Sequence, residues 1–227
     1  MQERAISFNW HFNYHAGAPM YLPDHFAETD PARMTALILA APLACIVAHT
    51  SAGLLANHIP LLLAPDGNLI GHIARANPMH EQIADGQEVL AVFQGPDAYV
   101  SPNFYPSKHE HHRHVPTWNY MVVHAHGTIR FQHDLQARRA AVGLLTREHE
   151  RRVNATAAWR MADAPADYMA QMLDAIVAFR IDVQRLEGKS KLSQNRDARD
   201  HTGAIAGLHA SGQTAIADEM ASQGPPE

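Results

Sequence analysis

The amino-acid sequence predicts a mainly β protein with flanking helices, of the α+β class. Apolar runs of strand length follow one another between residues 43 and 132, and turn segments such as Ser51–Gly53 and Pro65–Asn68 separate them. Segments with helical spacing lie on both sides of this region. Five or six strands within about ninety residues are typical of a barrel, so we expect the strands to form one.

The strands and helices can be placed along the chain. A helix is expected to begin at Asp30, a capping residue followed by Pro31, and to end before Pro42. The predicted strands are LACIVAHT, LLANHIPLLL, LIGHIAR, EVLAVFQG, AYVS, TWNYMVVHAHGTIRFQ and IVAFRIDVQRLEG, with a short helix, MHEQIADG, after the third. Further helices are expected at residues 134–152, at residues 167–172 and from Asn195 onward.

A chain of 227 residues fits one domain with appendages. We expect an N-terminal appendage at residues 1–19, a domain at 20–211 and a loosely held tail at 212–227, which is small and polar. Residues 1–19 end in a Gly-Ala-Pro breaker directly before a second methionine, Met20.

Composition excludes several classes of protein. Hydrophobic residues make up 46% and charged residues 18%, which is ordinary for a globular protein and excludes disorder. No apolar stretch approaches the roughly 20 residues needed to span a bilayer. The N-terminus has an early acid, Glu3, and lacks the pattern of a secretory signal, and Cys45 is a lone thiol. The expected location is therefore the cytoplasm.

The charge pattern argues against direct DNA binding. The formal net charge is −5, and the basic residues form no long stripe. Of the 18 basic residues only Lys108, Lys189 and Lys191 are lysines, and all three fall in segments that resemble binding motifs.

One such segment is GHIARANP, which combines the groups that bind phosphate. Arg75 ends a strand, Asn77 can cap the next helix, and the amides after Pro78 can point at an anion. An ordinary strand-to-helix turn with a surface arginine is the alternative.

A second segment is LLANHIP, in which Asn57 and His58 interrupt an apolar strand. Backbone groups there would be free to meet a planar heterocycle. A polar strand edge, with Pro60 marking it, explains the same pattern.

The third segment, EGKSKLSQNR, is expected to follow a strand directly. It holds two lysines, two serines, Gln194, Asn195 and Arg196 within ten residues, a density of donors that suits an anionic or carbonyl-rich ligand. A solvated charged loop is the alternative.

The loop from Pro102 to Pro116 contains four clustered histidines, His109, His111, His112 and His114. Neutral imidazoles bind zinc, copper or nickel, but the spacing is not that of a standard site, so the pattern favours an exposed histidine-rich loop without a metal. The sequence contains no GxGxxG, P-loop, CxxC pair, GxSxG or HExxH motif.

Taken together and in order, MYLPDHF, NHIP, GHIARANP, QGPDAYVSPNFYPSK, VPTWNY and RLEGKSKLSQNR resemble the PaiB family of FMN-binding negative transcriptional regulators, over about Met20–Leu208. The resemblance implies a six-stranded Greek-key split β-barrel of the FMN-binding type, shared with pyridoxamine phosphate oxidases. It also implies a homodimer with FMN at each end of the interface. Residues 1–19 and the histidine-rich loop depart from the family pattern.

The resemblance also implies a set of cofactor-binding residues. Arg75 and Asn77 would bind the flavin phosphate, and the strand at Asn57–Ile59 would run beside the isoalloxazine ring. A cation at Lys191 or Arg196 near flavin N1 and the C2 carbonyl would stabilise the anionic reduced form. The group from one subunit comprises Asn57, His58, Ile59, His72, Ala74, Arg75 and Asn77, and the group approaching from the other comprises Trp118, Asn119, Lys191, Gln194, Asn195 and Arg196.

Two functions follow from these expectations. The first is an FMN-binding regulatory protein that acts indirectly, through a partner or by sensing a small-molecule ligand. The second is an FMN-dependent oxidoreductase of a small substrate, because a bound flavin is redox-active. No residue is an evident catalytic acid or base, although His58, His72 and Lys191 are candidates for trial. A metal- or haem-handling protein using the histidine-rich loop is a third reading.

Overall fold

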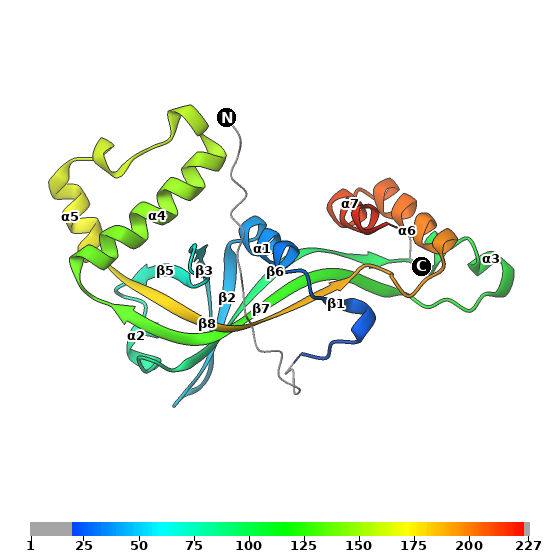
Figure 1. Cartoon of the computed structure of the whole chain (residues 1–227), viewed down its shortest axis with the longest axis horizontal. Coiled ribbons are helices and arrows are strands. Elements are labelled where there is room, and N and C mark those ends of the chain that lie inside the picture. The colour runs from blue at the N-terminus through cyan, green and yellow to red at the C-terminus, as the bar shows by residue number, and fades with distance from the viewer. Residues whose placement is uncertain (1–19, 225–227) are drawn as a thin grey trace. The chain divides into compact units, whose positions relative to one another are not determined.

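The structure is a computed structural model that describes residues 20–224. Its central element is an antiparallel sheet of eight strands with the order β3-β2-β6-β7-β8-β5-β4, and β1 pairs with β8 beside this path (Figure 1). The predicted mainly β fold with flanking helices is confirmed. The sheet has more strands than the six expected, and it does not close on itself.

The strands are β1 (Ala27–Glu28), β2 (Leu43–Thr50), β3 (Gly53–Pro60), β4 (Leu62–Leu63), β5 (Leu69–Ala74), β6 (Glu88–Val100), β7 (Thr117–Gln132) and β8 (Ile176–Lys191). EVLAVFQG and AYVS, expected as two strands, form the single strand β6. The last strand extends beyond its predicted end at Gly188, so Lys189–Lys191 also belong to β8, and only the second half of EGKSKLSQNR follows the strand. Lys189 and Gly188 are held there by pairing with β1, which the sequence pattern did not predict.

The helices are α1 (Pro31–Ala40), α2 (Met79–Gln82), α3 (Lys108–His111), α4 (Leu135–Val153), α5 (Ala166–Asp174), α6 (Ala198–Ala210) and α7 (Thr214–Gln223). Short 3-10 turns lie at Asp24–Phe26, Pro102–Phe104, Ala155–Ala157 and Met161–Asp163. The predicted start of α1 is confirmed, because Asp30 Oδ1 accepts a hydrogen bond from Ala32 N at 2.8 Å. Asp134 caps α4 in the same way through Ala137 N.

The described chain forms two compact units. The first comprises residues 38–93 and 124–186, and the second comprises residues 20–37, 94–123 and 187–224. Strands β6, β7 and β8 contribute residues to both.

The first unit holds the meander of β2 to β5 together with α4 and α5. Its fully buried core includes Ile46, Phe93, Ile129 and Phe179, and α4 packs against β5 (Figure 1). A Cβ added at Gly71 on β5 would lie 2.5 Å from the ring of Phe179, so close packing of the aromatic ring on this strand requires glycine.

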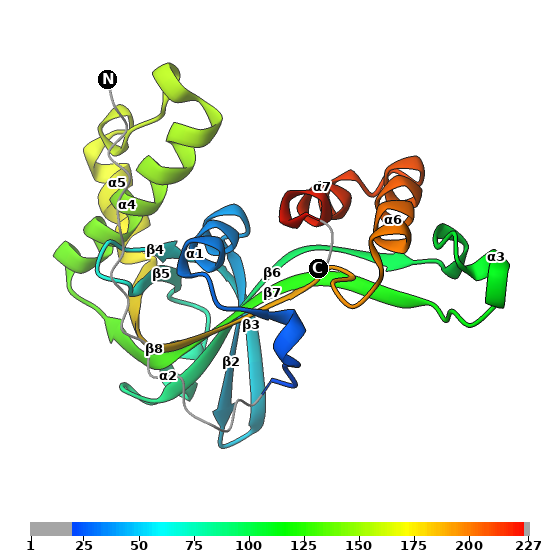
Figure 2. The ribbon, with the colours of Figure 1, turned by 45° about the vertical axis from the view of Figure 1, so that its right-hand side comes forward.

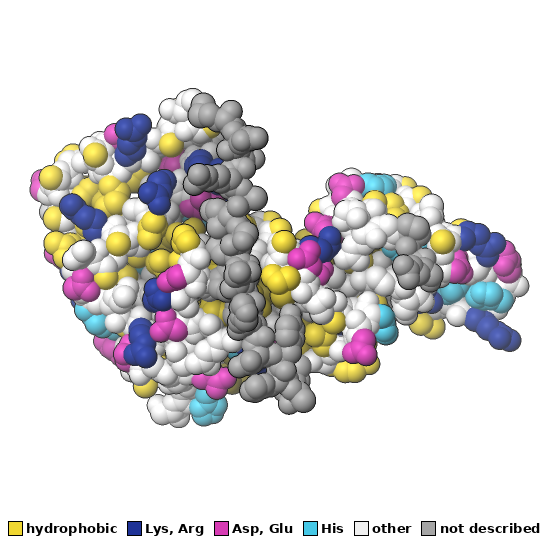
Figure 3. Space-filling model, in the orientation of Figure 1, with side chains coloured by type: hydrophobic (Ala, Val, Ile, Leu, Met, Phe, Trp, Pro, Cys, Tyr) yellow, Lys and Arg dark blue, Asp and Glu magenta, His cyan; other side chains and the backbone are white. Residues whose placement is uncertain are grey.

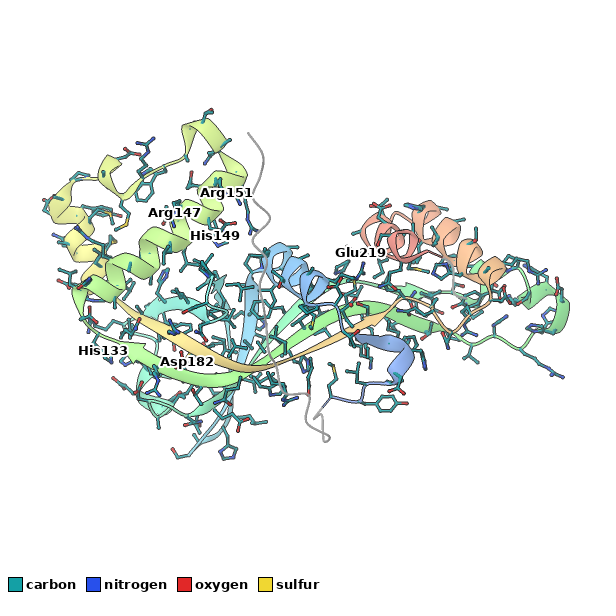
Figure 4. All side chains as sticks on the ribbon, viewed as in Figure 1. His133, Arg147, His149, Arg151, Asp182 and Glu219 are labelled. Atoms are coloured by element: carbon teal, nitrogen blue, oxygen red, sulfur yellow. The ribbon has the colours of Figure 1, made fainter. Side chains whose placement is uncertain are left out.

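An ion-pair network lies on the first unit at Asp182 of β8, which is labelled in Figure 4. Asp182 accepts hydrogen bonds from Arg180 at 2.6 Å and from Arg130 at 3.2 Å. The hydrogen bond from Arg180 holds the pKa of Asp182 below its ordinary value against the effect of burial. Since these side chains are partly exposed, each pair contributes little to stability.

In the second unit, α6 and α7 pack beside each other, as Figure 2 shows. Ile216 and Met220, one helical turn apart on α7, are buried together with Leu208 of α6. The expectation that residues after Gly212 form a loose tail is therefore wrong. The sequence of α7 consists mostly of small and polar residues, so its short apolar face, which packs against α6, was not recognised from the sequence pattern.

The expected N-terminal appendage at residues 1–19 lies outside the described residues. On the described part of the face drawn in Figure 3, basic side chains stand apart from one another, with acidic side chains between them. Among the described residues, no helix is long and apolar enough to cross a membrane.

Candidate functional site

The first predicted group lies on β3, β5 and the turn that follows β5, all within the first unit. Asn57 and Asn77, twenty residues apart, are brought together by a hydrogen bond of 3.3 Å between Asn77 Nδ2 and Asn57 Oδ1. His58 is exposed and Ile59 is buried, as alternation along a strand requires. Within residues 20–224, no strand pairs with the outer edge of β3, so backbone groups of this strand remain available to a ligand.

His72 on β5 carries an unsatisfied polar atom. Its Nδ1 is buried and has no hydrogen-bond partner in the described part of the chain. Burial lowers the pKa of His72 below its ordinary value, which favours the neutral imidazole. A buried ring nitrogen without a partner fits a site that a ligand completes, because leaving such an atom unpaired is costly.

Arg75 and Asn77 form the turn between β5 and α2. Arg75 donates from Nε to the Asp174 carbonyl at 2.6 Å and from Nη2 to the Ile176 carbonyl at 3.5 Å, which anchors an otherwise exposed guanidinium. Asn77 Oδ1 accepts from Met79 N, the first residue of α2, at 3.0 Å, although the N-cap position itself is occupied by Pro78. The remaining N–H groups of Arg75 suit an anion.

Ala74 is exposed at the end of β5, directly before Arg75. It presents only a methyl group and backbone atoms, so any contact with a ligand there is made by the main chain. The first group thus offers one anchored cation, two linked amides, a buried imidazole and free strand backbone.

The second predicted group lies on β7, at the end of β8 and in the segment that follows, all within the second unit. Trp118 is 54% exposed and makes an edge contact with Tyr99, which is 48% exposed, at 6.2 Å between ring centroids. Two neighbouring aromatic side chains left this open to solvent are typical of a surface that another molecule covers.

The amides of the second group are used within the protein. Asn119 is 1% exposed, and its Nδ2 donates to Ser193 Oγ at 2.9 Å and to Met220 Sδ at 3.3 Å. Gln194 Oε1 accepts from Leu192 N at 2.7 Å. Both side chains therefore shape the segment after β8, whereas Asn195 is exposed. Ser193 adopts φ of 66°, which makes the sharp bend there.

Lys191 ends β8 and is tied to the start of β7. Its Nζ donates to Thr117 Oγ1 and to the Trp118 carbonyl. Burial lowers the pKa of Lys191 from its ordinary value, and the nearby cations Lys189 and Arg196 lower it further. A bound anion would relieve this crowding of positive charge.

Arg196 lies among residues that the sequence did not mark as a group. Its guanidinium carbon lies 4.9 Å from the centroid of the Tyr105 ring, and Nη1 lies 3.4 Å from His114 Nδ1. His114 Nε2 in turn contacts Ser107 Oγ at 2.6 Å and Asp200 Oδ2 at 3.2 Å. Asp200 is 93 residues from Ser107, and no periodicity or motif signals the contact.

The histidine-rich loop is only partly an open loop. His109, His111 and His112 are exposed as expected, but the side chain of His114 is 8% exposed. In the part of the chain that the structure describes, none of these four histidines belongs to a group of three ligating side chains close enough to share a metal ion.

A cavity of about 310 Å³ lies in the first unit between α4 and the sheet. Its lining comprises Ile70, Gln132, Asp134, Gln136, Ala137, Ala140, Ala141, Leu144 and Arg180. None of the predicted cofactor-binding residues belongs to this lining, so the cavity is separate from both groups.

The open antiparallel sheet with flanking helices is the split-barrel fold of flavin-binding proteins. Residues 20–185 match the family described as "Putative FMN-binding domain", and the chain belongs to this family. Its cofactor is accordingly a flavin, as the motifs predicted. Lys191 and Arg196 lie beyond the matched residues.

Relatives of known sequence support the same assignment. An uncharacterized protein of Emericella nidulans is 30% identical, over 83% of this chain and 90% of that protein. The protease synthase and sporulation protein PAI 2 of Bacillus subtilis is 27% identical, over 83% of this chain and 89% of that protein. The predicted resemblance to the PaiB family is thereby confirmed.

Solved structures confirm the fold. The FAD and heme binding protein of Mycobacterium smegmatis is similar with a TM-score of 0.56 and 18% identity, over 78% of this chain and 79% of that one. A flavocytochrome of Azotobacter vinelandii has a TM-score of 0.54 and 13% identity, over 73% and 69% of the two chains. At these identities the likeness concerns the fold alone.

Proposed function

We propose that the chain is an FMN-binding protein of PaiB type that acts indirectly on transcription, through a partner or by sensing a small-molecule ligand. The observation that carries this proposal is the family match, which spans the whole first group of polar side chains. The unsatisfied Nδ1 of His72 and the unpaired edge of β3 support it, because both offer hydrogen-bonding capacity that a flavin can use.

In this proposal each residue of the first group has a role. Arg75 and Asn77 bind the flavin phosphate, and Ala74 contributes backbone contacts. The strand at Asn57–Ile59 runs beside the isoalloxazine ring, and His72 donates or accepts a hydrogen bond through Nδ1. When bound, the flavin supplies reversible redox chemistry that no amino-acid side chain offers.

The second group acts from the other subunit of a homodimer. Trp118, Lys191, Asn195 and Arg196 approach the cofactor, while Asn119 and Gln194 hold the segment that carries them. The exposed pair of Tyr99 and Trp118 supports a dimer, since a second copy would cover it. Trp118→Ser is expected to raise the monomer fraction in sedimentation. An unchanged dimer in this variant would place the interface elsewhere.

Charge supports indirect action. The net charge of −5 and the scattered basic side chains do not favour direct binding to DNA. The lone cysteine, Cys45, favours a reducing compartment such as the cytoplasm. Salt-sensitive binding of the purified protein to specific promoter DNA would contradict indirect action.

An FMN-dependent oxidoreductase is the alternative function. The lowered pKa of Lys191 favours it, because this side chain gives up a proton more readily than an ordinary lysine and could exchange one with a bound flavin. Rapid reduction of the flavin by a nicotinamide donor, followed by turnover with an electron acceptor, would support this function.

The test of flavin binding is direct. The purified protein is expected to be yellow, or to turn yellow with added FMN and quench its fluorescence with 1:1 stoichiometry per chain. Chromatography of the released cofactor should identify FMN. A colourless protein that does not quench FMN fluorescence would overturn both the regulatory and the enzymatic proposals.

A further inference from the structure

Arg196 is held on two sides in the second unit. The ring of Tyr105, which is fully buried, lies 4.9 Å from the guanidinium carbon and provides a fixed aromatic surface. His114 faces one edge of the guanidinium, with 3.4 Å between its Nδ1 and Arg196 Nη1. The other N–H groups of Arg196 make no side-chain hydrogen bond within residues 20–224 and are available to a ligand.

The opposite edge of His114 is fixed by a buried carboxylate. Asp200 is 1% exposed and accepts from Ser107 N at 3.0 Å and from Ser107 Oγ at 2.6 Å. Burial alone would raise the pKa of Asp200, but the two hydrogen bonds from Ser107, together with the charge of Arg199, outweigh it, so the pKa is lowered. The group is therefore an ionised carboxylate, which only accepts hydrogen bonds.

This arrangement fixes where the imidazole proton lies. The single proton of the Ser107 hydroxyl goes to Asp200, so Ser107 Oγ can only accept at its contact of 2.6 Å with His114 Nε2. Nε2 must then carry the proton, and its distance of 3.2 Å to Asp200 Oδ2 agrees with this. In the neutral ring, Nδ1 is left with a lone pair, and it is this atom that faces Arg196.

The cluster is not a hydrolytic triad. In such a triad the acid and the serine bond to opposite nitrogens of the histidine. Here Asp200 and Ser107 both contact Nε2, and Arg196 takes the other nitrogen. The network therefore orients an arginine and does not activate a nucleophile.

We propose that His114 is a positioning residue that, through its Nδ1 lone pair, presents the guanidinium of Arg196 to the flavin. This inference rests on the proposed function, in which Arg196 contacts the cofactor. An arginine side chain loses considerable rotamer freedom when it is fixed, so fixing it before the ligand arrives tightens binding. Ser107 and Asp200 act one step further back, by setting the tautomer of His114.

Two substitutions of His114 distinguish the roles of its two ring nitrogens. His114→Gln keeps an N–H donor toward Ser107 and Asp200 but removes the acceptor that faces Arg196. His114→Asn keeps an acceptor near the position of Nδ1 and loses the donor. We expect His114→Gln to raise the FMN dissociation constant about three- to tenfold, as for loss of one hydrogen bond. His114→Asn is expected to bind FMN with nearly the wild-type affinity. Because it loses the donor toward Ser107 and Asp200, it should unfold at a lower urea concentration than the wild type.

A double-mutant cycle with Arg196→Gln tests the coupling, with binding followed by quenching of FMN fluorescence. In the Arg196→Gln background, His114→Gln is expected to have no further effect. His109→Gln, the same change at an exposed histidine of the same loop, is the control and should bind as wild type. Equal effects of His114→Gln in both backgrounds, or no effect in either, would overturn the inference.

Failure of the proposed function gives a different result. If the wild-type protein does not bind FMN, the proposed function falls, and this inference with it. If the wild type binds FMN and His114→Gln binds it with the same affinity, the inference falls and the proposed function stands. The imidazole ¹⁵N shifts of the wild-type protein give a test that needs no variant, because a proton on Nδ1 of neutral His114 would also overturn it.

Discussion

At the level of single residues, the two proposed flavin-binding groups differ in how much of their hydrogen-bonding capacity the protein itself uses. The side-chain amides of Asn119 and Gln194 form hydrogen bonds with buried neighbours, so substituting either residue would disturb the fold of the second unit. Arg75 and Arg196 are anchored at one edge and keep N–H groups free. Binding experiments should therefore begin with the arginines.

Arg75 can be tested with two ligands. If Arg75 binds the flavin phosphate, Arg75→Gln should weaken FMN binding by about tenfold or more, as expected for loss of a hydrogen bond to a charged group. Binding of riboflavin, which lacks the phosphate, should change little. Arg139→Gln, at an exposed position on α4, is a control. Equal losses for FMN and riboflavin would show that Arg75 acts on the fold or on the ring.

Lys191 can be tested by the flavin potential. A cation near N1 and the C2 carbonyl stabilises the anionic reduced flavin, so Lys191→Ala should make the midpoint potential more negative. A loss of about 1.5–3 kcal/mol corresponds to roughly 30–60 mV for a two-electron couple. Spectroelectrochemistry with Lys108→Ala as a control measures the shift. An unchanged potential in both Lys191→Ala and Arg196→Ala would contradict the proposed role of these cations.

The sequence located candidate residues better than it located their partners. The position of Arg75 directly after a strand follows from a local pattern, and so does the hydrogen bond from Met79 N at the start of α2 to the Asn77 side chain. The contact of Asp200 with Ser107 spans 93 residues and depends on packing of α6 against the 3-10 turn at Pro102–Phe104. No local pattern encodes such a contact, and the spacing of the four histidines does not distinguish His114 from its exposed neighbours.

At the level of elements, the sequence predicted most strands because their apolar runs end at turns. Its errors have physical causes. The break at Gly95-Pro96 suggested two strands, but β6 passes through it as one strand. Gly95 also packs closely in the fold, because a Cβ there would lie 3.0 Å from Leu37 Cδ1. α7 was missed because alanines and polar residues conceal the apolar pair Ile216 and Met220.

Two helical glycines provide a matched test of packing. Gly143 in α4 has room for a methyl group, whose nearest neighbour would be Met161 Sδ at 3.5 Å, so Gly143→Ala should stabilise by about 0.5–1 kcal/mol through helix propensity. Gly203 in α6 has no room, because a Cβ would lie 2.5 Å from the Phe104 carbonyl oxygen. Gly203→Ala should destabilise by about 1–3 kcal/mol. Urea unfolding measures both, and equal effects would show that α6 does not pack against this turn as described.

At the level of the whole molecule, long strands β6, β7 and β8 contribute to two compact units, each with its own core. The proposed cofactor group of each unit is incomplete by itself: the first supplies phosphate and ring-edge contacts, and the second supplies aromatic and cationic side chains. In the homodimer proposed above, the first unit of one subunit and the second unit of the other would supply all thirteen proposed residues to one flavin. The sedimentation of Trp118→Ser and the FMN-binding experiments described above test this arrangement.

Buried and partly buried histidines of both units make stability depend on pH. Burial lowers the pKa of His72, His124, His126 and His201 below the ordinary value of 6.5. As the pH falls through 6.5, the unfolded chain therefore takes up protons at these imidazoles that the folded chain does not, and the free energy of unfolding decreases. The limit is about 1.4 kcal/mol per pH unit for each such imidazole.

We therefore expect the urea midpoint, measured at fixed protein concentration without added flavin, to be lower at pH 5.5 than at pH 7.5. His124→Gln should reduce this difference, since it removes one partly buried imidazole whose pKa is lowered by burial and further by His126 and Arg185. His109→Gln, at an exposed histidine, should retain the wild-type difference. A midpoint that stays constant or rises on acidification would mean that these imidazoles are protonated in the folded protein, and the burial described here would then be wrong.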